Sequence, residues 1–166
     1  MTPFKTFAAT MLVAGFAIPA TAQMATPTPK TFVAKAGASD KFEIIEAKLM
    51  MGSKNPDIVS FANQMVTDHT KSTMMVKTAA KSDGLMPAPP MLDAKQRQDL
   101  AALTAQHGKA RDALYLTQQQ AAHADALALM QTYASTGTAP HLKDTASQIV
   151  PVVQSHVDML GKMSAM

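Results

Sequence analysis

The sequence has no cysteine and no tryptophan, and its only aromatic residues are two tyrosines and six phenylalanines. The absence of cysteine excludes disulfide bonds and thiolate metal sites. Alanine, methionine, glutamine, lysine and leucine are abundant instead, and this composition favours helices over sheets. We therefore expect a helical domain that is stabilised by packing alone.

Strong charge and long apolar runs are also missing. The formal net charge at pH 7 is only +3, and it is spread along the chain, which argues against a nucleic-acid partner. The one apolar run, within residues 7–20, is too short and too rich in alanine to cross a bilayer, which takes about 20 strongly apolar residues. We predict no transmembrane segment in the mature chain, and no other partner is indicated.

The first residues have the pattern of a secretory signal. Lys5 precedes the apolar run, and Ala20-Thr21-Ala22 follows it as a site of cleavage near Ala22-Gln23. We expect residues 1–22 to be a signal peptide, so that the mature protein is periplasmic or secreted. Residues 23–38, rich in Pro, Thr and Ala, are predicted to be a flexible linker, and residues 39–163 the folded domain.

Helix signals divide this domain into four long helices and one short one. Asp40 and Glu43 have the spacing of a capping box for the first helix. Asn55-Pro56 predicts the start of the second helix, and Asp83-Gly84 its end. The remaining helices are expected at about 93–106, 109–135 and from Pro140 onward. The predicted fold class is all-α, a four-helix bundle with a short extra helix in the central connection.

Three histidines fall on the apolar stripes of three different helices: His69, His123 and His156. A helix rises about 1.5 Å per residue, and this places the three rings near the middle of the bundle, at a height close to that of Glu43. A buried polar ring needs a partner, because burying it unpaired costs roughly 2–7 kcal/mol. The spacing predicts that these side chains meet in one layer.

Such a layer has two interpretations. Inward carboxylates and imidazoles are the ligands from which bundles build metal sites, and iron, manganese or zinc would suit them. The only glutamates, Glu43 and Glu46, lie on the first helix, and the Glu-x-x-His motif of di-iron bundles is absent, so a dinuclear site is short of acids. Alternatively, the histidines form a polar core layer with Asp68, Asp112 and Tyr115 that specifies helix packing.

The 14 methionines include the pairs Met50-Met51 and Met74-Met75. Methionine is usually a flexible core filler. A copper site would require methionines and histidines gathered on one surface, and the spacing of the methionines does not indicate such a cluster. Copper binding at Met74 and Met75 stays open as a third hypothesis.

Several of these residues belong to a wider pattern. It consists of FANQMVTDHTKS over residues 61–72, Asp112-x-x-Tyr115 with His123 eight residues after the tyrosine, Pro151 followed by His156, and Glu46. In this pattern the chain resembles the secreted bacterial proteins grouped as domain of unknown function 4142, which are placed among ferritin-like bundles. The resemblance covers about residues 39–163, with Arg111 where the family usually has Phe.

The resemblance implies a ferritin-like fold, export, and no established activity. By analogy with ferritin-like bundles it implies Glu46, His69, His123 and His156 as metal ligands. Our first hypothesis is a non-catalytic structural, stress-related or interaction module. The second is a metal-binding protein for storage, sensing or oxidative protection. The chain has neither G-x-S-x-G nor H-E-x-x-H, so a hydrolase is not supported and the hypothesis of a non-enzyme is preferred.

Overall fold

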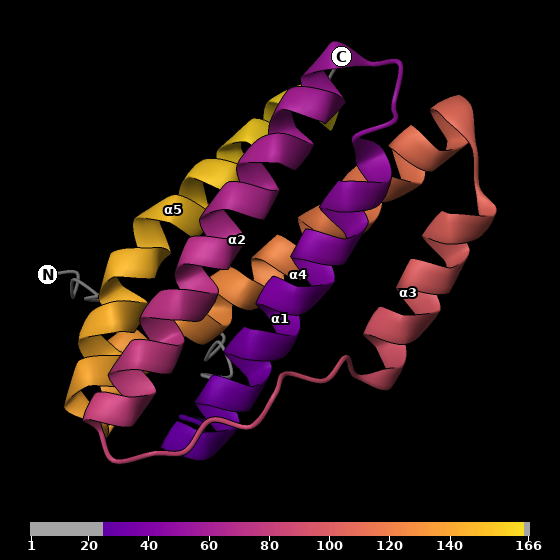
Figure 1. Ribbon diagram of the computed structural model, residues 1–166. Coiled ribbons are helices and arrows are strands. Elements are labelled where there is room, and N and C mark those ends of the chain that lie inside the picture. The colour runs from indigo at the N-terminus through magenta and orange to yellow at the C-terminus, as the bar shows by residue number, and fades with distance from the viewer. Residues whose placement is uncertain (1–24, 165–166) are drawn as a thin grey trace, which may run out of the picture.

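The computed structural model describes residues 25–164, and every regular element within that range is a helix. The elements are α1 (Pro29–Met50), α2 (Pro56–Ser82), α3 (Ala94–Ala105), α4 (Gly108–Thr136) and α5 (Pro140–Ser164). Four long helices pack together and the short α3 lies in the connection between α2 and α4 (Figure 1). The predicted fold class is confirmed.

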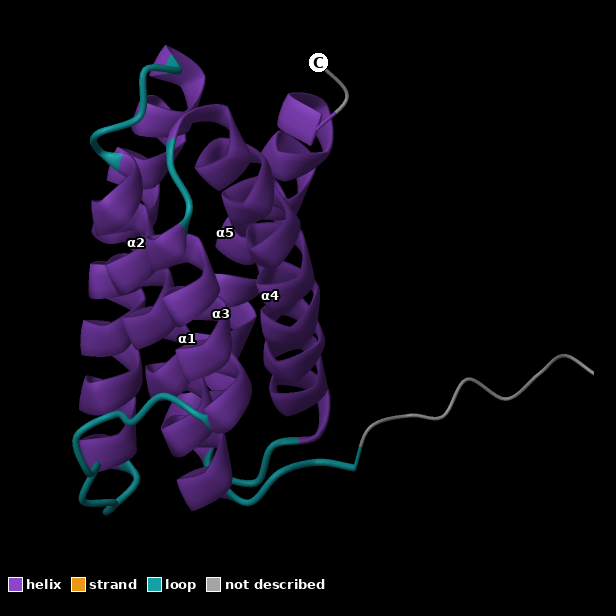
Figure 2. Ribbon diagram, turned by 90° about the vertical axis from the view of Figure 1, so that its right-hand side faces the viewer, coloured by secondary structure: helices purple, strands orange, loops and turns teal. Residues whose placement is uncertain are grey.

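The bundle consists of two antiparallel pairs. Helix α1 packs mainly on α2, and α4 mainly on α5, while α2–α5 and α1–α4 contacts close the bundle. The segment from the end of α2 through α3 runs back along the length of the bundle (Figure 1). Helices α2 and α4 therefore run in the same direction, and the connection between them is a crossover. The view in Figure 2 shows loops at both ends of the bundle.

Local sequence signals account for most helix ends. The Asn55 side chain accepts a hydrogen bond from the Asp57 amide at the start of α2, as predicted. Asp93 and Gln96 form a reciprocal capping box at the start of α3. Gly84, at φ +76°, lies just after the end of α2, in a backbone conformation that favours glycine.

Helix α1 begins at Pro29 rather than near Ser39, so the predicted linker is wrong for residues 29–38. Thr28 caps the helix by accepting a hydrogen bond from the Thr31 amide, and proline suits the first helical position. The added turns are held by packing, since the ring of Phe32 stacks on Tyr133 with centroids 3.9 Å apart. The predicted signal peptide, residues 1–22, lies outside the described residues.

Two apolar clusters fill the two ends of the bundle and leave a polar layer between them. On α2 they occupy residues 58–65 and 76–80, and His69 falls between. On α4 they include Tyr115 and residues 126–133, with His123 between, and α5 repeats this arrangement around His156. The layer between the clusters contains the histidines because each helix interrupts its apolar stripe at the same height.

On α5 the valine that faces the core is Val153, which is 3% exposed, whereas the neighbouring Val152 is 40% exposed. The buried positions of α5 are spaced alternately four and three residues apart. Between Ile149 and His156 this spacing places Val153, and not Val152, toward the core.

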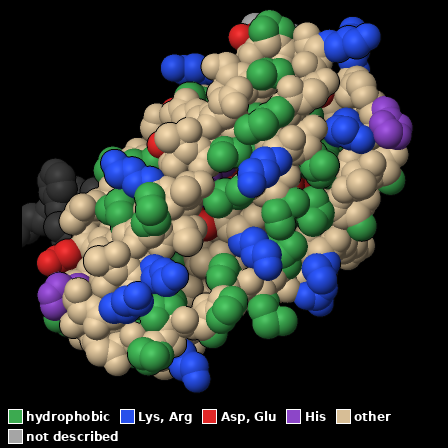
Figure 3. Space-filling model, viewed as in Figure 1, with side chains coloured by type: hydrophobic (Ala, Val, Ile, Leu, Met, Phe, Trp, Pro, Cys, Tyr) green, Lys and Arg blue, Asp and Glu red, His purple; other side chains and the backbone are tan. Residues whose placement is uncertain are grey.

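The surface and the helix lengths add two further observations. On the face shown in Figure 3, Lys and Arg side chains are scattered among polar and apolar ones. Within residues 25–164 no helix is both long enough and apolar enough to cross a membrane.

Candidate metal centre

Three histidines from three helices meet in the middle of the bundle. His69 on α2, His123 on α4 and His156 on α5 have ring centroids 5.3–5.6 Å apart. One ring nitrogen of each lies within 4.8 Å of the corresponding nitrogens of the other two. All three side chains are buried. The prediction that they occupy one layer is confirmed.

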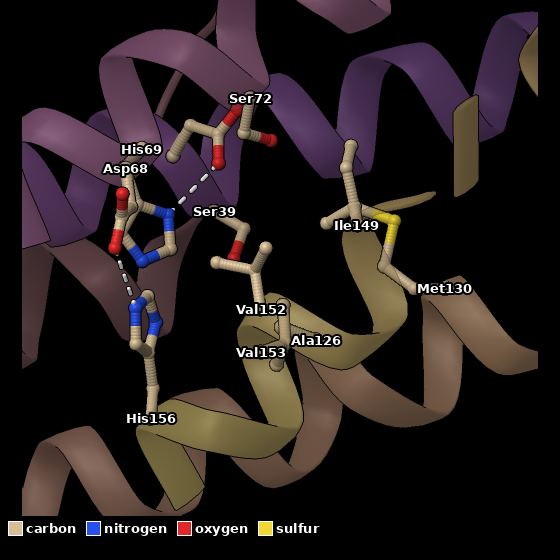
Figure 4. A pocket seen from close by; sticks show the side chains of 11 residues that line it. Ser39, Asp68, His69, Ser72, Ala126, Met130, Ile149, Val152, Val153 and His156 are labelled. Atoms are coloured by element: carbon tan, nitrogen blue, oxygen red, sulfur yellow. Dashed lines mark hydrogen bonds and ion pairs between the residues drawn. The ribbon is translucent and has the colours of Figure 1, made fainter. Parts of the chain in front are cut away.

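Each ring is held from outside by a hydrogen bond to one of its nitrogens. His69 Nδ1 lies 2.9 Å from Asp40 Oδ1, and His156 Nε2 lies 3.0 Å from Asp68 Oδ2. His123 Nδ1 donates to the Gln119 carbonyl oxygen at 2.9 Å. Figure 4 shows the bond between His156 and Asp68. These contacts fix the orientation of the rings and direct the remaining nitrogens elsewhere.

The remaining nitrogens have no hydrogen-bond partner among the described residues. They are Nε2 of His69, Nε2 of His123 and Nδ1 of His156. Leaving a buried polar atom unpaired costs about 1–3 kcal/mol. In protein metal sites, a ligating histidine typically donates its other ring nitrogen to a carboxylate or a backbone carbonyl. The three histidines have that arrangement, and together they could hold a metal ion.

Burial keeps two of the three rings neutral. Burial, together with the neighbouring His69 and His156, lowers the pKa of His123 to about 3, so this ring is uncharged near neutral pH. Burial also lowers the pKa of His156, although its bond to Asp68 acts in the opposite direction. A neutral imidazole has a free lone pair, which is the form that binds metals.

His69 behaves differently. Burial opposes a charge on this ring, but the hydrogen bond to Asp40 and the nearby Glu43 carboxyl outweigh it and raise the pKa of His69 above its usual value. A proton on His69 therefore competes with any metal ion for this ring, and metal binding would release that proton.

The role of Asp40 differs from the prediction. The sequence predicts it in a helix cap, but it lies in the middle of α1, is 3% exposed, and also accepts a hydrogen bond from Thr73 Oγ1 at 3.0 Å. A signal for this position does exist in the sequence. From Phe32 onward the stripe 32, 36, 40, 43, 47, 50 has helical spacing, and Asp40 falls on it.

The two glutamates form a second buried layer, on the side of the histidines that faces the α1–α2 turn. Glu43 lies mid-helix rather than in a cap, and its Oε1 is 3.9 Å from His123 Nδ1. Glu46 Oε2 accepts a hydrogen bond from Gln119 Nε2 at 3.0 Å. Burial raises the pKa of Glu43 to about 7 and that of Glu46 to about 8. Glu46 is not part of the group whose ligand atoms converge.

The other three predicted layer residues lie at different heights. Asp68 is in the site, through its bond to His156. Asp112 accepts a hydrogen bond from Ser53 Oγ at 2.9 Å, near the turn between α1 and α2. Tyr115 is fully buried with its ring edge-on to Phe61, and its hydroxyl has no hydrogen-bond partner among the described residues.

Comparison with solved structures supports the fold. The crystal structure of a DUF305 fragment from Deinococcus radiodurans matches with a TM-score of 0.72, covering 86% of this chain and 99% of that one. Sequence identity is 18%, so the likeness concerns the fold alone. A search among curated proteins found no match. Residues 15–163 match the family described as "Domain of unknown function (DUF4142)", and the chain belongs to that family.

Proposed function

We propose that this protein binds one transition-metal ion between His69, His123 and His156. One arrangement carries the proposal: a ring nitrogen from each of three helices lies within 4.8 Å of the other two, and each ring has one hydrogen-bonded and one unpartnered nitrogen. A histidine layer that served packing alone would gain nothing from leaving its three inner nitrogens unpaired.

The donor set favours some ions over others. Three imidazoles suit zinc and iron(II), whereas manganese prefers oxygen ligands. Of the three metals expected from the sequence, zinc and iron(II) therefore fit best. Three protein ligands would leave one position of a tetrahedral ion open to water or another small ligand.

The surrounding charges suit a divalent cation. Asp40 and Asp68, each bonded to the outer nitrogen of a ligand histidine, can supply two negative charges, which would balance the ion. Glu46, proposed as a ligand by analogy, would be a neighbour of the site through Gln119 rather than a ligand.

At the level of the organism, we propose an exported metal-binding protein for storage, sensing or oxidative protection. The signal-like pattern at residues 1–22 supports export. The second candidate is a structural or interaction module, which the outer hydrogen bonds favour because they join α1 to α2 and α2 to α5.

Metal content and thermal melting distinguish the two candidates. The protein is purified without a metal-binding tag and compared with His69→Ala and His156→Ala, with His107→Ala as a control at an exposed histidine outside the site. We expect about one equivalent of metal, and a higher melting temperature with metal, only in wild type and His107→Ala. Metal-free protein throughout, with the two site variants simply less stable, would favour the structural role.

A further inference from the structure

A small cavity adjoins the histidine layer on the side away from the glutamates. The cavity has a volume of about 20 Å³, which suits one water or one diatomic molecule. His69 and His156 form part of its wall (Figure 4). The rest of the wall combines apolar and polar residues: Ala126, Met130, Ile149, Val152 and Val153 on the one hand, and Ser39, Asp40, Asp68 and Ser72 on the other.

The cavity covers one face of the layer, as the helix register shows. Ser72 follows His69 by three residues, Ala126 follows His123 by three, and Val153 precedes His156 by three. Helix α5 runs opposite to α2 and α4, so all three residues lie on the same side of the histidines (Figure 1). Because His69 and His156 line this cavity, a small molecule in it would lie beside an ion held by the three histidines.

Ser72 contributes a buried hydroxyl to the cavity wall. Ser72 is 7% exposed, and its Oγ has no hydrogen-bond partner among the described residues. Hydroxyls elsewhere in these helices donate to the carbonyl four residues earlier, as Thr67, Thr117 and Ser147 do. Ser72 makes no such bond, so its hydroxyl is free to donate into the cavity.

We propose that this cavity binds a neutral diatomic ligand of the metal, such as nitric oxide or dioxygen, with Ser72 as its hydrogen-bond donor. The volume excludes larger molecules, and the Asp40 and Asp68 carboxyls on the wall disfavour anions. A route from solvent passes Asp68, whose side chain is 27% exposed, and Val152, which is 40% exposed, since both lie on the cavity wall. The inference rests on the proposed metal site.

The test uses the protein loaded anaerobically with iron(II) and titrated with nitric oxide. Electron paramagnetic resonance reports the ferrous–nitrosyl adduct, and iron content is measured separately. Wild type and the control Ser147→Ala are expected to form the adduct with equal affinity. Ser72→Ala should bind the same iron but hold nitric oxide about fivefold to tenfold more weakly, as for one lost hydrogen bond.

Filling the cavity gives a second, steric test. Ala126→Val adds two methyl groups to the wall and should reduce the adduct at least tenfold at unchanged iron content. If Ala126→Val does not fold, the nitric oxide affinity of Ser72→Ala still tests the proposal. Iron-loaded wild type without an adduct, or one nitric oxide affinity shared by wild type and Ser72→Ala, would overturn the cavity proposal alone. Failure of wild type to bind iron(II) would also overturn the cavity proposal, and failure to bind zinc as well would overturn the metal site itself.

Discussion

At the scale of single residues, Asp40 sets His69 apart from the other two histidines. The carboxyl of Asp40 bonds the outer nitrogen of His69 and raises its pKa, whereas burial lowers the pKa of His123 and of His156. Asp40 thereby holds the ring in place and makes it more basic. Both effects strengthen a metal ligand, although a more basic ring also retains its own proton to higher pH.

Asp40→Asn should weaken metal binding about 10–100-fold, because the outer partner of a ligand histidine normally contributes that much. The affinity is measured by competition with a chelator at fixed pH, and Asp125→Asn provides a control at an exposed acid on α4. For wild type the affinity should also fall as the pH is lowered, since His69 then keeps its proton. An affinity unchanged in Asp40→Asn would show that Asp40 does not support the site.

Glu46 provides a residue-scale test that does not involve metal. Its pKa in the folded protein is raised from 4.5 to about 8 by burial, so the folded state holds a proton that the unfolded state has lost. Stability from this group is therefore full below about pH 4.5 and is lost as the pH rises through 8. Between pH 6 and 9 the loss in free energy of unfolding is on the order of 2 kcal/mol.

Glu46→Gln, a neutral side chain of the same shape, should escape this loss. We expect the metal-free variant to be more stable than wild type at pH 9, with the difference shrinking toward pH 6. Urea unfolding at both pH values measures it, with Asp125→Asn as a control at an exposed acid on α4. A variant that is less stable than wild type at pH 9 would mean that Glu46 is ionised and stabilised in the folded protein.

At the scale of elements, short-range signals predicted most of the fold. The starts of α2 and α3 and the end of α2 follow from Asn55-Pro56, Asp93 and Asp83-Gly84, because these residues act through local hydrogen bonds and backbone geometry. The start of α1 was missed because Thr28-Pro29 lies in a Pro/Thr-rich stretch that resembles a linker. What holds these turns is the stacking of Phe32 on Tyr133, a contact with a residue distant in sequence.

The same difference between local signals and contacts distant in sequence explains which site residues could be predicted. His69, His123 and His156 could be predicted because each interrupts an apolar stripe of its own helix. The role of Asp40 could not be predicted once α1 was started too late, since Asp40 then fell in a cap. Glu46 was proposed by analogy, and its bond to Gln119 depends on how α1 and α4 pack, which no single helix encodes.

Phe32→Ala tests whether the first turns of α1 belong to the folded domain. Removing a fully buried phenylalanine ring is expected to cost about 3–5 kcal/mol of unfolding free energy. Denaturant unfolding measures the change, and Met86→Ala in the exposed connection serves as the control. An unfolding free energy equal to that of wild type would mean that residues 29–38 do not pack on α4 in solution.

At the scale of the whole molecule, the bundle has two apolar ends joined by a central polar layer. The proposed ligands come from α2, α4 and α5, and α1 is joined to them through Asp40, so one ion would tie together all four long helices. An ion that binds only the folded state adds to stability by mass action. The crossover places α2 and α4 parallel, and it is this topology that brings Ser72 and Ala126 to one side of the histidines.

X-ray absorption spectroscopy of the zinc- or iron(II)-loaded protein tests the central claim most directly, because it reports the ligands of the ion itself. The account predicts three imidazole nitrogens, at about 2.0–2.1 Å for zinc, plus one additional light ligand. His156→Ala should lose this signature. A first shell made of carboxylate oxygens, or one without imidazole, would contradict the claim that His69, His123 and His156 form the metal site.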